Sequence, residues 1–294
     1  MALPAYATVG QHVWHWCYLG FCAIVLFFLV APLIVVIPLS FTSSAFLSFT
    51  PEMLSFDPEG YSLRWYRILF GDCSDKTITT VCSDKWMIGT RNSLFIAFFA
   101  TIMASTLGTL AALGLSRPHM PYRKLIMAFM ISPLIVPLII TASGMFLFYA
   151  KFQLVATFTG LIIAHTVLGM PFVVITVTAT LVGFDQSLTR AAASLGGTPL
   201  RTFFKVQMPL ILPGVISGGL FAFITSFDEV VVVLFMGGVE QLTLPRQMWS
   251  GIRQEISPTI LSAATILVCF SILLLASVEL LRRRNERLRG VTPG

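Results

Sequence analysis

Residues 183–213 read GFDQSLTRAAASLGGTPLRTFFKVQMPLILP and separate two long apolar stretches of the chain. A backbone that lies in hydrocarbon must satisfy all its polar groups internally, so a polar interruption of this length belongs in water. Because the flanking stretches are apolar enough to enter a bilayer, the segment predicts a folded loop on one face of a membrane protein.

The polar segment has the signals of two short helices. Asp185 or Ser187 is suited to cap the first helix, and the pair Gly196–Gly197 is suited to end it. Thr198–Pro199 supplies a cap residue followed by proline at the first helical position of the second helix. A structured helical pair at a membrane surface is typical of a docking element, and docking implies a partner.

The composition predicts an all-α, polytopic membrane protein, since 56% of the residues are hydrophobic and only 11% are charged. A span needs roughly 20 apolar residues. The six stretches that meet this length are 17–41, 90–116, 125–150, 157–182, 210–236 and 258–281. The first is too long for a signal peptide, so we expect it to be a retained helix in a single membrane domain over 1–294.

The distribution of lysine and arginine predicts the orientation. The tail after the last span carries five arginines, and with the loops 117–124 and 183–209 it brings eleven of the nineteen basic residues to one side. Such an excess marks the cytoplasmic side, and an even number of spans places both termini there. The basic residues lie at span ends and not on one folded face, which argues against nucleic-acid binding.

Two segments on the opposite side, 42–89 and 237–257, leave the membrane. The first contains Cys73 and Cys82, which we expect to form a disulfide in an oxidising compartment. Within it, 61–66 resembles a short amphipathic helix at the interface. Either segment could contact a soluble partner or only cover the helix bundle.

Small residues recur every four positions in the second span, from Ala100 to Ala112, and in the fifth, at Gly214, Gly218 and Ala222. This spacing lets helices approach closely in lipid, either within one subunit or against a second one. Pro133, Pro137 and Pro171 predict bent helices in the third and fourth spans.

Acidic side chains inside the fifth span are the strongest candidates for chemistry. Asp228 and Glu229 are flanked by apolar residues, and a charge at the bilayer centre costs roughly 2.5–3.5 kcal/mol. Successive helical residues point about 100° apart, so one carboxylate could face a pathway and the other a neighbouring helix. A polar clamp between helices is the alternative. Phe227 and, in the fourth span, His165 are further candidates, although a buried, hydrogen-bonded role suits the histidine better.

No phosphate-binding loop, nucleophile elbow or zinc-binding motif occurs in the sequence, which predicts a chain that is not an enzyme, binds no cofactor and holds no metal.

The 183–209 segment resembles the EAA loop of binding-protein-dependent ABC importer permeases. In that family a Glu-Ala-Ala triplet precedes a glycine, and a Leu-Pro element follows. The matching residues here are Arg190-Ala191-Ala192, then Gly196, then Met208-Pro209, with arginine and methionine in place of the usual glutamate and leucine. The resemblance implies that the loop couples the chain to an ATPase through Arg190, Ala191, Ala192, Gly196, Gly197, Pro199, Arg201 and Pro209.

The resemblance extends along the spans. Residues 226–231, SFDEVV, with the later Leu244-Pro245 and Met248-Trp249, are similar to the permease subunits of spermidine/putrescine importers. The resemblance implies a type I ABC importer permease in the bacterial inner membrane, paired with a companion permease subunit that is a different chain. It also implies two ATPase subunits that hold ATP and Mg, and a periplasmic substrate-binding protein. It implies a polyamine or related cation as substrate and a loop that moves when ATP binds.

Two other interpretations stay open at this point. The same architecture could import ferric iron, an opine or an amino acid such as GABA, and a lone acidic pair does not decide among them. A stand-alone six-helix channel is the other, and the folded docking loop argues against it.

Overall fold

The computed structural model describes residues 8–72, 84–117, 119–254 and 257–288, and the regular elements in these ranges are helical. The helices are α1 (Val9–Leu39), α2 (Pro51–Leu54), α3 (Arg64–Leu69), α4 (Lys85–Leu115), α5 (Arg123–Ile135), α6 (Leu138–Ala150), α7 (Phe158–Val182), α8 (Gln186–Ser194), α9 (Pro199–Thr202), α10 (Met208–Phe227), α11 (Val231–Met236), α12 (Leu244–Gln254) and α13 (Thr259–Leu288). The all-α prediction is confirmed. Cys73 and Cys82 lie outside the described residues.

The core of the bundle is formed by α4, α7 and α10, which pack closely because small residues line their contacts. A Cβ atom added to Gly108 of α4 would lie 2.8 Å from Val173 of α7, and one added to Gly169 of α7 would lie 2.9 Å from Ala222 of α10. The stripes of small residues therefore serve packing within this subunit, which was one of the two alternatives.

Within the described residues, five helical runs are long and apolar enough to cross a membrane: α1, α4, α7, Pro199–Phe227, and Thr259–Ser277 of α13. The third span, expected over 125–150, is broken: α5 and α6 meet at 104°. Pro137 explains the break, because a proline forces the preceding residue, Val136, into an extended backbone (φ −72°, ψ 133°).

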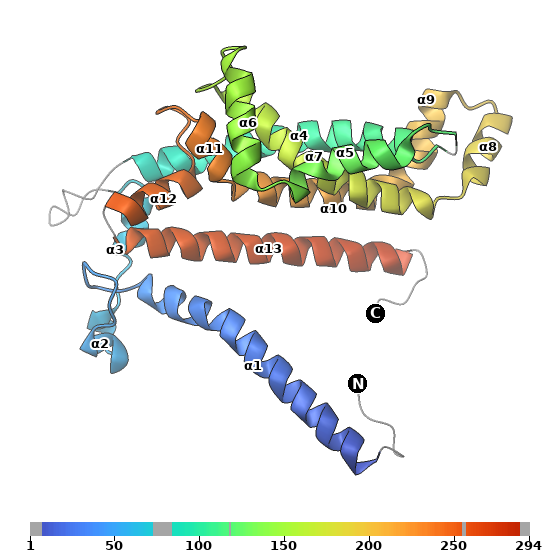
Figure 1. Cartoon of the computed structure of the whole chain (residues 1–294). Coiled ribbons are helices and arrows are strands. Elements are labelled where there is room, and N and C mark those ends of the chain that lie inside the picture. The colour runs from blue at the N-terminus through green and yellow to red at the C-terminus, as the bar shows by residue number, and fades with distance from the viewer. Residues whose placement is uncertain (1–7, 73–83, 118, 255–256, 289–294) are drawn as a thin grey trace.

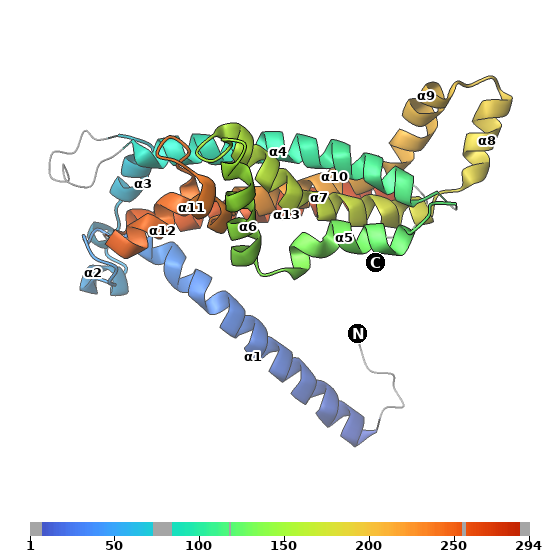
Figure 2. The ribbon, with the colours of Figure 1, turned by 45° about the horizontal axis from the view of Figure 1, so that its top comes forward.

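Helix α1 stands away from the bundle (Figures 1 and 2) and is exposed along its apolar length. The chain meets the bundle again just after α1, where the Ser262 hydroxyl of α13 donates a hydrogen bond to the Ser40 carbonyl oxygen (3.1 Å). The start of α1, the end of α13 and the α8–α9 segment all lie at one end of the molecule (Figure 1), as expected if they share one side of the membrane.

The segment after α1 folds back on itself at the opposite end. The predicted interfacial helix over 61–66 begins later, as α3, and Trp65 is buried with its indole nitrogen donating to the Thr42 carbonyl oxygen (2.8 Å). Trp65 therefore packs into the protein, and the position of this helix at the membrane interface stays a prediction.

At the same end, α4 holds the loop that leads into α12. The Asn92 amide donates to the carbonyl oxygens of Glu240 and Leu242, both at 2.8 Å, and the Ser93 hydroxyl accepts from the Leu244 amide at 2.9 Å. These polar side chains at the start of an apolar helix thus fix the position of α12.

Candidate functional site

The predicted docking loop forms the α8–α9 segment, which projects from one end of the bundle (Figure 2). Of the two candidate caps, Asp185 is the residue that caps α8: its carboxylate accepts from the Ser187 amide (2.8 Å) and the Ser187 hydroxyl (2.7 Å). The hydroxyl bond, the amide bond and the positive charge of Arg190 lower the pKa of the Asp185 carboxyl. The cap therefore stays ionised at neutral pH.

The turn between α8 and α9 depends on the two predicted glycines in different ways. Gly196 has a left-handed backbone (φ +78°), which favours glycine. Gly197 is limited by space, because a Cβ atom there would lie 2.7 Å from the Ala192 carbonyl oxygen. The next helix starts as predicted, with Pro199 at its first turn and the Thr198 hydroxyl accepting from the Arg201 amide (3.4 Å).

The sequence predicts that the second helix of the loop is separate from the fifth span, and the structure shows that the two are continuous. Residues Pro199–Phe227 form one continuous helical run, in which Phe203–Gln207 is a π-helical turn between α9 and α10. Pro209 accounts for the widened turn, because it lacks the N–H that an α-helix would direct to residue 205 and its ring crowds that carbonyl. Pro209 therefore lies inside the helix instead of ending the loop.

The surface of the α8–α9 segment is apolar as well as basic. The side chains of Leu195, Leu200 and Phe204 are 89%, 72% and 60% exposed. Arg190 and Arg201 are also exposed. Large apolar side chains gathered at one exposed turn mark an interaction surface, so the α8–α9 segment, which also carries Arg190 and Arg201, is available for docking.

The second candidate site is a break in the fifth span, which had been expected to continue from 210 to 236. Helix α10 ends at Phe227 and α11 begins at Val231, so Asp228 and Glu229 lie between two helices and not inside one. A broken helix at membrane depth leaves backbone groups free and is tolerated where it lies in protein or beside a cavity. Broken helices also form the binding sites of many transporters.

The two carboxylates of the break have different surroundings. Glu229 is 7% exposed, and its Oε1 accepts from the Val232 amide at 2.9 Å, so it caps the start of α11. Asp228 is exposed, and its backbone amide closes the last turn of α10 by donating to the Ile224 carbonyl oxygen (3.0 Å). Sequence alone left open which residue faces a pathway; the exposed side chain is that of Asp228.

The electrostatics of the break favour a cation. The C-terminal end of a helix carries a partial negative charge, and the Asp228 carboxylate stands at that end of α10. The carboxylate of Glu229 offsets the partial positive charge at the start of α11. The exposed side of the break is therefore negative.

His165 is buried and hydrogen-bonded, which is the role that the sequence favoured. Its Nδ1 lies 2.8 Å from the Ser226 hydroxyl oxygen and 3.1 Å from the Ser226 carbonyl oxygen. Since a carbonyl oxygen only accepts, we assign the proton to Nδ1. The other ring nitrogen, Nε2, is buried and has no partner within the described residues.

Phe227 packs against aromatic rings of its own helix and of α13. Its ring centroid lies 5.7 Å from that of Phe223 and 5.3 Å from that of Phe270 on α13. It therefore links the end of α10 to the last span, and a place in the substrate pathway remains a prediction for it.

These features together define a multi-pass membrane permease with a docking loop at one end and a broken helix in its core. Residues 104–287 match the model of the family described as binding-protein-dependent transport system inner membrane component. The chain belongs to this family, and it is therefore a permease subunit of a binding-protein-dependent ABC importer in the inner membrane. Subunits of this kind are not enzymes themselves.

Two curated relatives cover most of the chain. It is 32% identical to the putrescine transport system permease protein PotI of Escherichia coli over 248 residues, which is 82% of each chain. It is 29% identical to the spermidine/putrescine transport system permease protein PotC of Haemophilus influenzae over 239 residues, 81% of this chain and 89% of the relative.

The fold also matches a solved structure. A bacterial ABC transporter involved in the import of the acidic polysaccharide alginate has a chain that aligns with a TM-score of 0.66, covering 94% of this chain and 99% of the other at 14% identity. At that identity the likeness concerns the fold alone.

Proposed function

We propose that this chain forms half of an ATP-driven translocation pathway for a small cationic solute, and that the solute is a polyamine. The observation that carries the proposal is the exposed Asp228 carboxylate at the negative end of α10. A polyamine presents ammonium groups joined by methylene chains, and a single carboxylate offers one ammonium group a weak, transient stop. The polyamine named for the two curated relatives supports the same solute class.

Coupling to ATP is proposed to pass through the α8–α9 segment. The exposed side chains of Leu195, Leu200 and Phe204 would seat in a groove of an ATPase subunit, which itself holds ATP and Mg. Because α9, the π-helical turn and α10 are one helical run, a displacement of α9 would move α10 and the break at its far end.

Three kinds of partner complete the assembly that we propose. Two ATPase subunits would engage the docking loops, one loop from each membrane subunit. A companion permease, which we propose is a different chain, would supply the other half of the pathway. A periplasmic substrate-binding protein would deliver the solute to the end opposite α8–α9.

The test is ATP hydrolysis by the assembled importer, reconstituted in lipid with its binding protein, against a panel of solutes. Putrescine and spermidine should stimulate hydrolysis, whereas ferric iron, an opine and GABA should not. Stimulation by one of the other solutes alone would reject the polyamine while leaving the importer intact. Failure of any ATPase subunit to co-purify would reject the importer mechanism and favour a stand-alone channel.

A further inference from the structure

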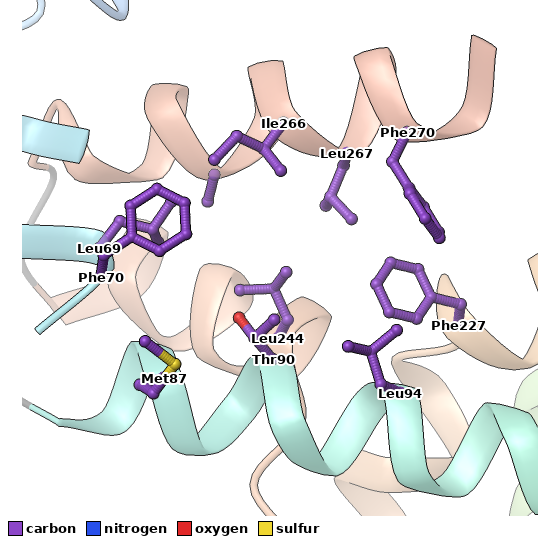
Figure 3. A pocket seen from close by; sticks show the side chains of 11 residues that line it. Leu69, Phe70, Met87, Thr90, Leu94, Phe227, Leu244, Ile266, Leu267 and Phe270 are labelled. Carbon is purple, nitrogen blue, oxygen red and sulfur yellow. The ribbon is translucent and has the colours of Figure 1, made fainter. Parts of the chain in front are cut away.

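An apolar cavity lies between α4 and α13, at the end of the bundle opposite α8–α9 (Figure 3). Its volume is about 140 Å³. The walls come from five helices and the turn after α3, and Thr90 is the polar side chain among residues that are otherwise hydrophobic. An apolar lining of this kind accepts apolar guests.

The cavity is open on its side. Phe70, Met87 and Leu94 line it and are 62%, 43% and 42% exposed. At one end of the cavity, Phe227 and Phe270 face each other, with ring centroids 5.3 Å apart (Figure 3). Its lining on α13 runs from Ala263 to Phe270, about 10 Å of helix, and falls within the apolar stretch that we place in the membrane.

Two arginines stand at the entrance. Arg67 is one turn before Phe70, and Arg91 lies between Met87 and Leu94 on the same face of α4. Both are exposed, and neither has an acidic partner in the part of the chain that the structure describes. Cations beside an apolar slot match a molecule with an anionic head and an apolar tail.

We infer that this cavity is a binding site for an anionic phospholipid, with one acyl chain between α4 and α13 and the phosphate at Arg67 and Arg91. A void in a membrane protein forfeits dispersion contacts, and the acyl chains of the surrounding lipid are the molecules able to restore them. The headgroup preference comes from the two arginines, because each interfacial cation contributes about 1 kcal/mol, or roughly fivefold, toward an anionic lipid.

The cavity lies next to the proposed pathway, but the lipid proposal does not depend on the proposed function. An acyl chain in the cavity would contact Phe227, and the next residue is Asp228. The lipid would therefore support the last turn of α10 from the side of α13. The inference stands whatever solute the importer carries.

The test is photo-crosslinking of the assembled importer in nanodiscs that contain phosphatidylglycerol with a diazirine in its acyl chain, with the phosphatidylcholine analogue in parallel. Mass spectrometry should find the label on the α4 and α13 peptides around the cavity. Leu94→Trp would fill the cavity and should abolish this label. Leu110→Trp is the matched control on α4, since Leu110 is 64% exposed and lies outside the cavity.

The headgroup is tested separately. The double variant Arg67→Gln/Arg91→Gln should lower the preference for phosphatidylglycerol by roughly fivefold for each arginine, and Arg123→Gln at the other end should not change it. Equal labelling in the two tryptophan variants, or an unchanged lipid preference in the double variant, would overturn the inference. So would a label that appears only when the companion subunit is absent, because a protein helix would then fill the slot. If Leu94→Trp does not elute as a folded assembly, Met87→Phe takes its place.

Discussion

The Nδ1 atom of His165 lies 2.8 Å from the Ser226 hydroxyl oxygen, and this contact ties α7 to the last turn of α10. Ser226 precedes the exposed Asp228 by two residues, so the histidine sets where α10 stops and where its carboxylate stands. A buried hydrogen bond at this point matters because the chain leaves helical geometry immediately after it.

We expect His165→Leu to destabilise the assembly, because the substitution leaves the polar atoms of Ser226 buried without a partner, at a cost of about 1–3 kcal/mol. His165→Asn is the matched control, since its amide nitrogen stands close to the position of Nδ1 and donates to the same carbonyl oxygen. The thermal midpoint of the purified assembly should fall for the leucine variant and recover for the asparagine variant. Equal midpoints would show that the contact contributes nothing.

Asp228→Asn should slow cation uptake by roughly 10- to 100-fold, since an interaction with a charged group contributes about 1.5–3 kcal/mol. The side chain is exposed, so assembly and the basal rate of ATP hydrolysis should be unchanged. Uptake of labelled putrescine into proteoliposomes measures the effect. Unaltered uptake would reject an acidic stop for the cation.

Glu229 provides the control for that experiment, because it neighbours Asp228 and has a different task. Glu229→Gln keeps an oxygen that accepts from the Val232 amide, so uptake should stay near the wild-type rate. Glu229→Leu removes the cap of α11, which costs about 1–2 kcal/mol, and should reduce the yield of folded assembly. A loss of uptake in the glutamine variant equal to that in Asp228→Asn would reject the division of roles.

The parts of the fold that follow local rules were predictable. Asp185 caps α8 and Thr198–Pro199 opens α9, since a cap depends on residue type within one turn of helix. The stripes of small residues likewise predicted close helix packing, because their spacing alone determines which faces can approach.

The breaks in the third and fifth spans were not predictable to the same degree. Hydropathy stays high through 136, and the Asp228–Glu229 pair marks a charge inside the fifth span without showing that the helix ends there. Pro137 was read as a bend and produces a 104° turn, whose size depends on what α6 packs against. The split between Asp228 and Glu229 depends on a hydrogen bond from the Val232 amide, which exists only once the chain has left α10.

Pro209→Ala tests the π-helical turn. The alanine would supply an N–H that can donate to the carbonyl of residue 205, so Phe203–Gln207 should relax to α-helix. Loss of the extra residue in the π-helical turn would rotate α9 relative to α10 by about 100°, so the docking face would point in another direction. We expect uptake per ATP hydrolysed to fall while hydrolysis continues. Pro213→Ala, inside α10, is the control and should keep the wild-type ratio; equal ratios in all three proteins would remove the turn from the mechanism.

Gly196 and Gly197 allow two requirements of the docking loop to be tested separately: a left-handed backbone at Gly196 and the absence of a side chain at Gly197. Gly196 has φ +78° and open surroundings, so Gly196→Val meets no neighbour and yet strains the backbone by about 1–2 kcal/mol. Asparagine adopts this conformation more readily, so Gly196→Asn should keep most of the uptake that Gly196→Val loses.

Gly197→Ala adds a single methyl group, which would lie 2.7 Å from the Ala192 carbonyl oxygen and force α8 and α9 apart. We expect this variant to insert into the membrane normally, to retain less ATPase subunit on purification, and to lose uptake. Because the change is the smallest possible one and lies far from Asp228, normal uptake together with normal ATPase retention would mean that the geometry of the α8–α9 turn does not govern docking.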